Sequence, residues 1–367
     1  LINLFSGGGM SNFSIIMMGV APYITASIIF QLLTMIIPKL EDLSKAPGGR
    51  EKINKYTRLA TVPLAFLQGY GMLAILRQSP KPIIDDFSFW NVIAILITVT
   101  AGTIFLMWIG ELITEKKIGN GISLLIFAGI ITRVPEILQE VAINFSREQL
   151  IQILVFGVIA LITIVGVVFI TEGQRNIPVS YAKRVRGMKM YGGMNTHLPL
   201  RVNQAGVIPI IFAISIILFP PMVSQFLLRA ETAWVKGLAE GIINIFNNQL
   251  FYGVLYFLLV FGFTYFYTAV VFHPYQIAEN LQKQGAFIPG IRPGNHTADY
   301  LQHTISKITL TGALFLALIA VLPLLLQNTM GMSSMVIGGT SILIVVSVVI
   351  ELIKQVESQM AMREYDV

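Results

Sequence analysis

The residues that could carry acid–base or metal chemistry in this chain are 4 histidines and 19 aspartates and glutamates, and none lies in the middle of an apolar run. The histidines, His197, His273, His296 and His303, all fall in polar connecting segments. An intramembrane hydrolase needs a nucleophile with a base, paired carboxylates or metal ligands within reach of one another. Proton-coupled carriers and voltage sensors also keep ionisable groups inside the bilayer. The pattern therefore argues against both classes.

Two further absences in the sequence restrict the chemistry. There is no cysteine, which excludes disulfides, iron–sulfur ligation and thiol catalysis. There is also no Gly-rich phosphate-binding loop followed by Lys and Ser or Thr, so any ATP or GTP that is used must be hydrolysed by a partner.

Polar but uncharged side chains do occur within the apolar runs. They are Thr25, Ser27, Gln31 and Thr34 in the first run, Gln68 in the second, and Asn203, Gln204 and Ser215 in the sixth. One interpretation is hydrogen bonding between packed helices, at about 0.6 kcal/mol for each bond. The other is that the first and sixth runs form a seam that parts and reseals.

The elements that must position these residues are apolar runs of membrane-spanning length. Of the 367 residues, 55% are hydrophobic and 12% are charged, against roughly 25% charged in a soluble domain. A span needs about 20 apolar residues, and only helices satisfy their own backbone groups in lipid. We therefore predict an all-α polytopic membrane protein with nine transmembrane helices, near residues 19–37, 57–77, 89–110, 119–139, 149–171, 203–228, 250–272, 308–327 and 336–353.

Basic residues are divided unevenly between the two sides of this arrangement. Of the 25 lysines and arginines, the loops on one side hold only Arg77, Lys81, Arg133, Arg147, Arg229 and Lys236. Cytoplasmic loops carry the excess of Lys and Arg. We therefore expect the other loops and the C-terminus to be cytoplasmic, and the net charge of +6 needs no nucleic-acid partner.

Two of the cytoplasmic loops are unusually long. The first, "TEGQRNIPVSYAKRVRGMKMYGGMNTHLPLRVNQ", contains Lys183, Arg184, Arg186 and Lys189, and its alternation predicts a small hairpin that projects from the membrane. It is either an enlarged topology signal or a docking surface for ribosomal RNA or an acidic protein face. The second holds a short amphipathic helix and the turn "IPGIRPG", in which Arg292 either snorkels or contacts a partner.

Six blocks of sequence, in order along the chain, resemble the SecY family of protein-conducting channels. They are "GVAPYITASIIFQLL", "REKINKYTR", "IGNGISLLIFAGI", "YAKRVRGMKMYGGMNTHLPLRVNQAGVIPIIFA", "QGAFIPGIRPG" and "GGTSILIVV". The resemblance implies two inverted, pseudo-symmetric halves that form a clamshell around a central pore with a lateral opening to lipid. We expect these halves at residues 1–140 and 141–367. The family has ten such helices, so the first helix and the N-terminal segment before it are expected to be missing from this chain, which starts at Leu1.

The resemblance also implies site residues. "GVAPYI" and "GISLLI" each place apolar residues four apart, on one helix face. Matched motif to motif, the pore ring of the family falls on Val20, Ile24, Ile122, Ile126, Ile211 and Ile344. The lateral gate is expected at Thr25, Gln31, Gln68, Asn203, Ser215 and Phe219. The stretch "FSGGGMSNFS" is either a frayed linker or the movable plug of the family, with Phe5, Ser6, Gly7, Gly8, Gly9 and Met10.

The function implied is a passive channel, not an enzyme and without a cofactor, that translocates unfolded preproteins and releases transmembrane segments into the membrane. The expected partners are SecE and SecG subunits, the SecA motor ATPase, the ribosome, signal sequences and nascent membrane proteins, the lipid bilayer and a YidC-type insertase. The expected location is the cytoplasmic membrane of a bacterium, although a plastid membrane fits the sequence equally. The alternatives are a secondary transporter of a neutral solute, suggested by the Gly/Pro-interrupted helices, and a lipid-modifying membrane enzyme.

Overall fold

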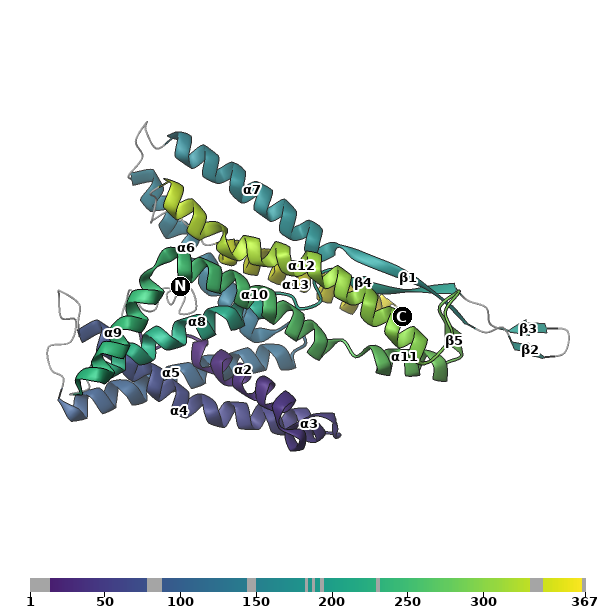
Figure 1. Cartoon of the computed structure of the whole chain (residues 1–367), viewed down its shortest axis with the longest axis horizontal. Coiled ribbons are helices and arrows are strands. Elements are labelled where there is room, and N and C mark those ends of the chain that lie inside the picture. The colour runs from purple at the N-terminus through teal and green to yellow at the C-terminus, as the bar shows by residue number, and fades with distance from the viewer. Residues whose placement is uncertain are drawn as a thin grey trace.

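The structure is a computed structural model of the whole chain. It describes residues 14–77, 88–143, 150–181, 184–186, 189–191, 195–228, 232–330 and 339–364. The chain is mostly helical, and its long helices run roughly along one axis (Figure 1).

The N-terminal part is built from helices α2 (Ala21–Ile36), α3 (Pro38–Lys45), α4 (Gly49–Arg77), α5 (Phe89–Glu115) and α6 (Gly121–Ile143). Pro22 lies in the first turn of α2, where its missing N–H costs nothing. Pro38 stops α2 and starts α3, and the chain bends there by 107°. Helix α4 packs against both α2 and α5, and α5 packs against α6.

The C-terminal part contains α7 (Leu150–Glu172), α8 (Ile208–Leu227), α9 (Ala233–Asn247), α10 (Gln249–Val271), α11 (Pro274–Lys283), α12 (Asn295–Met330) and α13 (Gly339–Glu364). Helix α10 packs along α12 and α8, while α13 packs against α7, α12 and α6. The short helix α9 lies at the opposite end of the molecule from α11 (Figure 1). The Asn248 side chain caps α10 by accepting hydrogen bonds from the backbone N–H groups of Leu250 and Phe251.

A small sheet corrects the expectation of an all-helical chain. Strand β1 (Gln174–Tyr181) pairs antiparallel with β4 (Asn195–Arg201) on one side and with β5 (Ala286–Phe287) on the other. Beyond it, β2 (Arg184–Arg186) and β3 (Lys189–Tyr191) form the tip of the predicted hairpin (Figure 1). Alternate β1 residues Ile177 and Val179 are buried against Leu301 of α12. The hairpin was predicted, but the third strand, supplied by the second long loop, was not.

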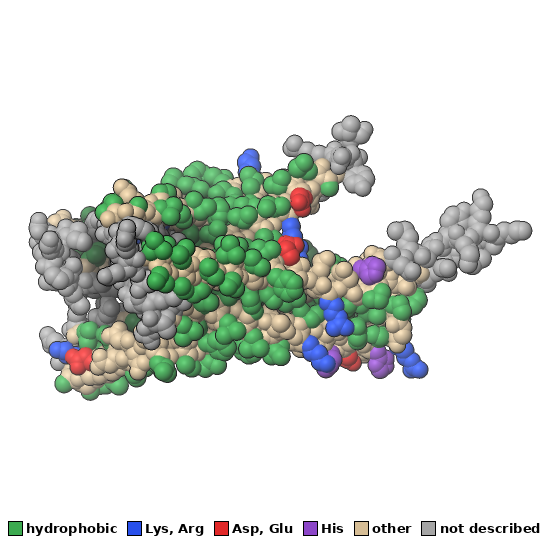
Figure 2. All heavy atoms as spheres, turned by 90° about the horizontal axis from the view of Figure 1, so that it is seen from above, with side chains coloured by type: hydrophobic (Ala, Val, Ile, Leu, Met, Phe, Trp, Pro, Cys, Tyr) green, Lys and Arg blue, Asp and Glu red, His purple; other side chains and the backbone are tan. Residues whose placement is uncertain are grey.

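Hydrophobic side chains cover the middle of the molecule, and the Lys, Arg and His side chains that Figure 2 shows gather mainly toward the end that carries the sheet. Every predicted apolar run coincides with a helix. By length and hydropathy, the described part of the chain contains 4 helices able to cross a membrane, or 5 if the bent pair α2–α3 is one span. The helical nature of the runs is thus confirmed, and nine spans stay a prediction.

Candidate functional site

The residues expected to form the pore ring come together in one buried cluster. Val20, Ile24, Ile126, Ile211 and Ile344 are between 0 and 6% exposed. The half-buried Ile122 packs against the same cluster. The residues come from the start of α2, the first two turns of α6, the start of α8 and the first turns of α13, so segments more than 300 positions apart meet at one place.

The first turn of α6 is held by local bonds that fix Ile122 and Ile126. The Asn120 side chain accepts hydrogen bonds from the backbone N–H groups of Ile122 and Ser123, at 3.1 and 3.3 Å, which satisfies two free donors of the helix start. The Thr114 hydroxyl donates to the Gly110 carbonyl and accepts from the Gly121 N–H, both at 2.9 Å. The end of α5 is thereby tied to the beginning of α6.

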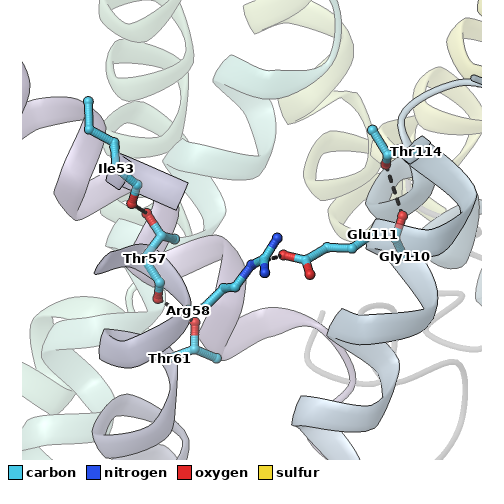
Figure 3. A network of polar contacts seen from close by, with 7 residues as sticks. All are labelled: Ile53, Thr57, Arg58, Thr61, Gly110, Glu111 and Thr114. Carbon is cyan, nitrogen blue, oxygen red and sulfur yellow. Dashed lines mark hydrogen bonds and ion pairs between the residues drawn. The ribbon is translucent and has the colours of Figure 1, made fainter. Parts of the chain in front are cut away.

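Two glycines allow this close approach of α5 and α6. A Cβ atom placed on Gly121 would lie 1.8 Å from the Gly110 carbonyl oxygen, and one on Gly110 would lie 2.6 Å from Ile122 Cδ1. No side chain fits at the first distance without moving backbone. One step further along α5, Glu111 forms an ion pair with Arg58 of α4, with 2.5 Å between Oε1 and Nε (Figure 3). The three helices α4, α5 and α6 are therefore linked near one end.

Replacing Gly121 with alanine should separate α5 from α6 and destabilise the protein by about 3 kcal/mol, the upper end of the usual cost of overpacking, because the obstacle is backbone. Thermal unfolding of the detergent-purified protein measures this effect. Gly157→Ala in α7 is the matched control, since no atom lies within 4 Å of the position that the new methyl group would take. An unchanged transition temperature for Gly121→Ala would contradict the proposed close packing.

The starts of α2 and α8 are also set by backbone geometry. Gly19, with φ of 56°, turns the chain immediately before Val20, which precedes the first residue of α2. Before α8, Gly206 has φ of 62°, and its carbonyl accepts a hydrogen bond from the Asn203 amide at 3.2 Å. These turns direct Ile24 and Ile211 toward the same cluster.

A cavity of about 130 Å³ borders the cluster. Ile24, Ile122, Ile126 and Ile211 are among its lining residues. Its other lining residues include the uncharged polar side chains Ser27, Gln31, Asn120 and Ser123. The cavity therefore has a mixed lining, to which the ring residues contribute apolar side chains and the other four contribute uncharged polar ones.

The polar residues expected at the lateral gate bond within their own part of the structure. Thr25 Oγ1 accepts a hydrogen bond from Gln68 Nε2 at 3.2 Å, which joins α2 to α4. Gln31 donates to Ser27 within α2, and Ser215 donates to the Ile211 carbonyl within α8. None of the hydrogen bonds of these described side chains runs from α2 or α4 to α8. Phe219 lies on α8 and is 45% exposed.

Helices α2 and α8 pack against each other, and Ile24 and Ile28 of α2 belong to the same apolar cluster as Ile214 and Ile217 of α8. Sequence reasoning offered interhelical bonding and an opening seam as alternatives for the polar residues. Thr25 and Gln68 follow the first alternative, and they do so inside the N-terminal part. These hydrogen bonds do not connect α2 to α8, and the contact between those two helices includes apolar packing.

An apolar cavity of about 630 Å³ between α4, α5 and α8 was missed from the sequence. It is lined by Val62, Phe66 and Leu67 of α4, Leu96 of α5 and Val223 of α8, among others. These residues are ordinary components of apolar runs, so no local signal distinguishes them. Only the packing of three helices creates the cavity.

The basic residues expected to contact partners lie at the end of the molecule that carries the sheet. Arg184, Arg186 and Lys189 belong to β2 and β3, while Lys183 falls outside the described residues, as do the expected plug residues Phe5–Met10. Arg292 is exposed in the turn between Gly290 and Gly294, whose φ values are 84° and 95°. The Thr297 hydroxyl donates to the Arg292 carbonyl at 3.0 Å, which fixes the turn.

Sequence comparison identifies the family. The SecY family model matches residues 14–353. The chain belongs to the SecY family. It is 44% identical to the protein translocase subunit SecY of Mycobacterium bovis and 45% identical to that of Corynebacterium glutamicum, and these matches cover 100% of this chain and 85 and 86% of the relatives.

Solved SecY-like structures share this fold. One described as a protein conducting channel aligns with a TM-score of 0.66 at 19% identity and covers 96% of this chain and 84% of its own. The Sec61 channel of a canine ribosome–channel complex aligns with a TM-score of 0.60 at 19% identity and covers 93% of this chain and 81% of its own.

Proposed function

We propose that this SecY-family protein is a passive protein-conducting channel. It would move unfolded preproteins across the membrane and release transmembrane segments sideways into lipid. The observation that carries the proposal is the meeting of Ile24, Ile126, Ile211 and Ile344 from four helices in one buried apolar cluster that borders a partly polar cavity. The names of the bacterial relatives, protein translocase subunits, support it.

An apolar ring suits a channel for polypeptides. Branched aliphatic side chains close a narrow passage by dewetting it, so that ions do not leak although no charge is present. The same side chains can yield around a passing chain of any sequence. A ring of carboxylates or lysines would instead retain segments of opposite charge.

The architecture we propose is a clamshell of halves 1–140 and 141–367 with nine membrane spans. The lateral gate would run between α2 and α4 on one side and α8 and α10 on the other. Apolar contact between α2 and α8 supports this, because no cross-seam hydrogen bond of Thr25, Gln68 or Ser215 has to break when the halves part. Residues Phe5–Met10, which include Gly7, Gly8 and Gly9, would serve as the plug.

Partners would supply the energy and complete the assembly. The protein itself would have no catalytic role. We propose SecA or the ribosome as the driving partner, docking on the basic hairpin of β2 and β3 and on Arg292. SecE, SecG and a YidC-type insertase would be membrane partners, and the location would be the cytoplasmic membrane of a bacterium with the basic loops inside.

Site-specific crosslinking to a stalled preprotein tests the proposal. A photoreactive residue at Ile126 and another at Gln31 should each crosslink to the preprotein. Ile126 lies in the ring, and Gln31 lines the cavity that borders the ring. Leu161 in α7, which is 64% exposed on the apolar surface, is the control position and should remain free of preprotein. Crosslinking at Leu161 alone would exclude the proposed path.

The neutral-solute transporter is less well supported. Such a carrier needs a binding site with polar groups near the membrane midplane, whereas the ring residues that meet in the buried cluster are aliphatic. We therefore retain the channel as the proposed function.

A further inference from the structure

Two glutamine side chains near the end of α13 converge on one backbone carbonyl in the loop between α5 and α6. Gln355 Nε2 and Gln359 Nε2 both donate to the Lys117 carbonyl oxygen, at 2.9 and 2.6 Å. Residues four apart lie on the same helix face. A carbonyl oxygen has two lone pairs and can accept both bonds. We call Gln355, Gln359 and the Lys117 carbonyl the cytoplasmic clasp.

The loop presents this carbonyl in a fixed conformation. Lys117 has φ of 58°, a left-handed backbone that is unusual for a residue with a side chain, and its N–H donates to the Thr114 carbonyl at 3.0 Å. Gly119 follows with φ of 137°, and a Cβ there would lie 3.3 Å from Leu352 Cδ2 of α13. The loop thus also approaches α13 closely at Gly119, next to the clasp. Strained backbone of this kind persists only where surrounding contacts enforce it.

The clasp joins the two proposed halves. Lys117 precedes α6, which carries Ile122 and Ile126, whereas Gln355 and Gln359 belong to α13, which carries Ile344. By contrast, the Thr25–Gln68 bond and the Arg58–Glu111 ion pair each stay within the first half. On α13, Lys354 forms an ion pair with Glu172 at 2.7 Å, next to the start of β1.

The clasp and the proposed gate lie at different contacts between the halves. Helix α13 packs against α6, α7 and α12, while α8 packs against α2 and α4. The α2–α8 contact is apolar, and the α13 contact adds two directional polar bonds to a rigid loop. Two halves joined in this way would separate at the contact between α2 and α8 and would pivot at the clasp.

Resting on the proposed channel function, we propose that the cytoplasmic clasp is a permanent hinge fastening. It positions α6 against α13, sets the spacing between Ile126 and Ile344 in the closed ring, and stays closed while α2 and α8 separate. Gln355 and Gln359 are therefore positioning residues that act through the ring. Their loss should loosen the idle channel before it affects the passage of a preprotein.

The double variant Gln355→Glu/Gln359→Glu tests the positioning role, because glutamate keeps the size of the side chain but cannot donate when ionised. In proteoliposomes with the complete translocase, we expect the idle ion leak to rise by about fivefold to tenfold, the effect of losing one or two ordinary hydrogen bonds. Gln355→Asn/Gln359→Asn, which retains the amides on a shorter side chain, should leak similarly. Glu357→Ala, exposed on the same turn of α13, is the control and should not leak.

A covalent crosslink between the Lys117 loop and α13 tests whether the clasp stays closed during translocation. Because the chain contains no cysteine, Lys117→Cys/Gln355→Cys can be joined selectively by a short bis-maleimide. The joined channel should be as tight as the wild type and should translocate preprotein at the wild-type rate, whereas a block on joining would overturn the hinge. If Gln355→Glu/Gln359→Glu showed the same idle ion leak as the wild type, the positioning role would be overturned. Failure of the unmodified protein to translocate in the same assay would instead overturn the proposed function.

Discussion

Asparagine in place of Ile211 should make the closed channel leak ions and should admit preproteins with poorly hydrophobic signal sequences. Ile211 is 6% exposed in the apolar cluster and borders the 130 Å³ cavity. An amide there would hold water in a passage that is closed by dewetting. If the barrier falls by about 1.4 kcal/mol, ion conductance rises about tenfold. Single-channel recording and export of a signal-sequence-defective preprotein measure the two effects.

Ile344→Asn should act in the same direction, since Ile344 is fully buried in the same cluster on α13. Leu161→Asn is the control, because it adds the same amide to α7 at a position that is 64% exposed and outside the ring. Ile211→Val should behave as the wild type, because it retains a branched aliphatic side chain. Normal conductance and normal selectivity in both asparagine variants would remove these residues from the ring.

Reversing the charge of Arg292 should impair partner-driven translocation without reducing the amount of inserted protein. The residue is exposed in a turn held by Gly290, Gly294 and the Thr297 hydroxyl, so its position is fixed but its side chain supports no core. Arg292→Glu would place like charges together against an anionic partner, at a cost of about 2 kcal/mol or more, or roughly 30-fold in affinity. Equilibrium binding of SecA and of ribosomes, with export rate in parallel, gives the measurement.

Lys236→Glu provides the matched control for Arg292→Glu. It makes the same charge reversal on α9, at the opposite end of the molecule (Figure 1). Binding and export should be unaffected by this change. If Arg292→Glu also bound both partners normally and supported normal export, the partner site would have to be sought elsewhere on the basic loops.

Local sequence patterns predicted most of the helices, although α4, α12 and α13 extend 8 to 13 residues beyond the predicted apolar runs and α9 was not predicted. The apolar runs coincide with helices because 20 apolar residues without turn signals leave the backbone no better way to satisfy its own groups in lipid. The bend after Ile36 at Pro38 and the capped start of α6 at Asn120 also have local causes, although neither was predicted. Each of these features depends on residues a few positions apart.

Features that depend on distant residues were not predictable in this way. The pairing of Tyr181 with Ala286 makes β5 the third strand of the sheet, yet β5 has only 2 residues and no strand pattern of its own. Gln68 was expected at an opening seam, and its bond to Thr25 instead joins two helices on one side of that seam. A polar residue in an apolar run identifies a hydrogen bond but not its partner.

The sequence by itself determined that this is a membrane protein of apolar helices, which loops are basic, and, through ordered motifs, its family. Composition and short-range spacing are sufficient for these conclusions, because membrane insertion and helix formation depend on the solvent around each segment and on bonds within one helix. The tertiary structure alone decided that Ile24, Ile126, Ile211 and Ile344 share one cluster and that Gln355 and Gln359 bind the Lys117 carbonyl. The physical reason is that packing and hydrogen-bond partners depend on how helices are placed in space, which no local periodicity records.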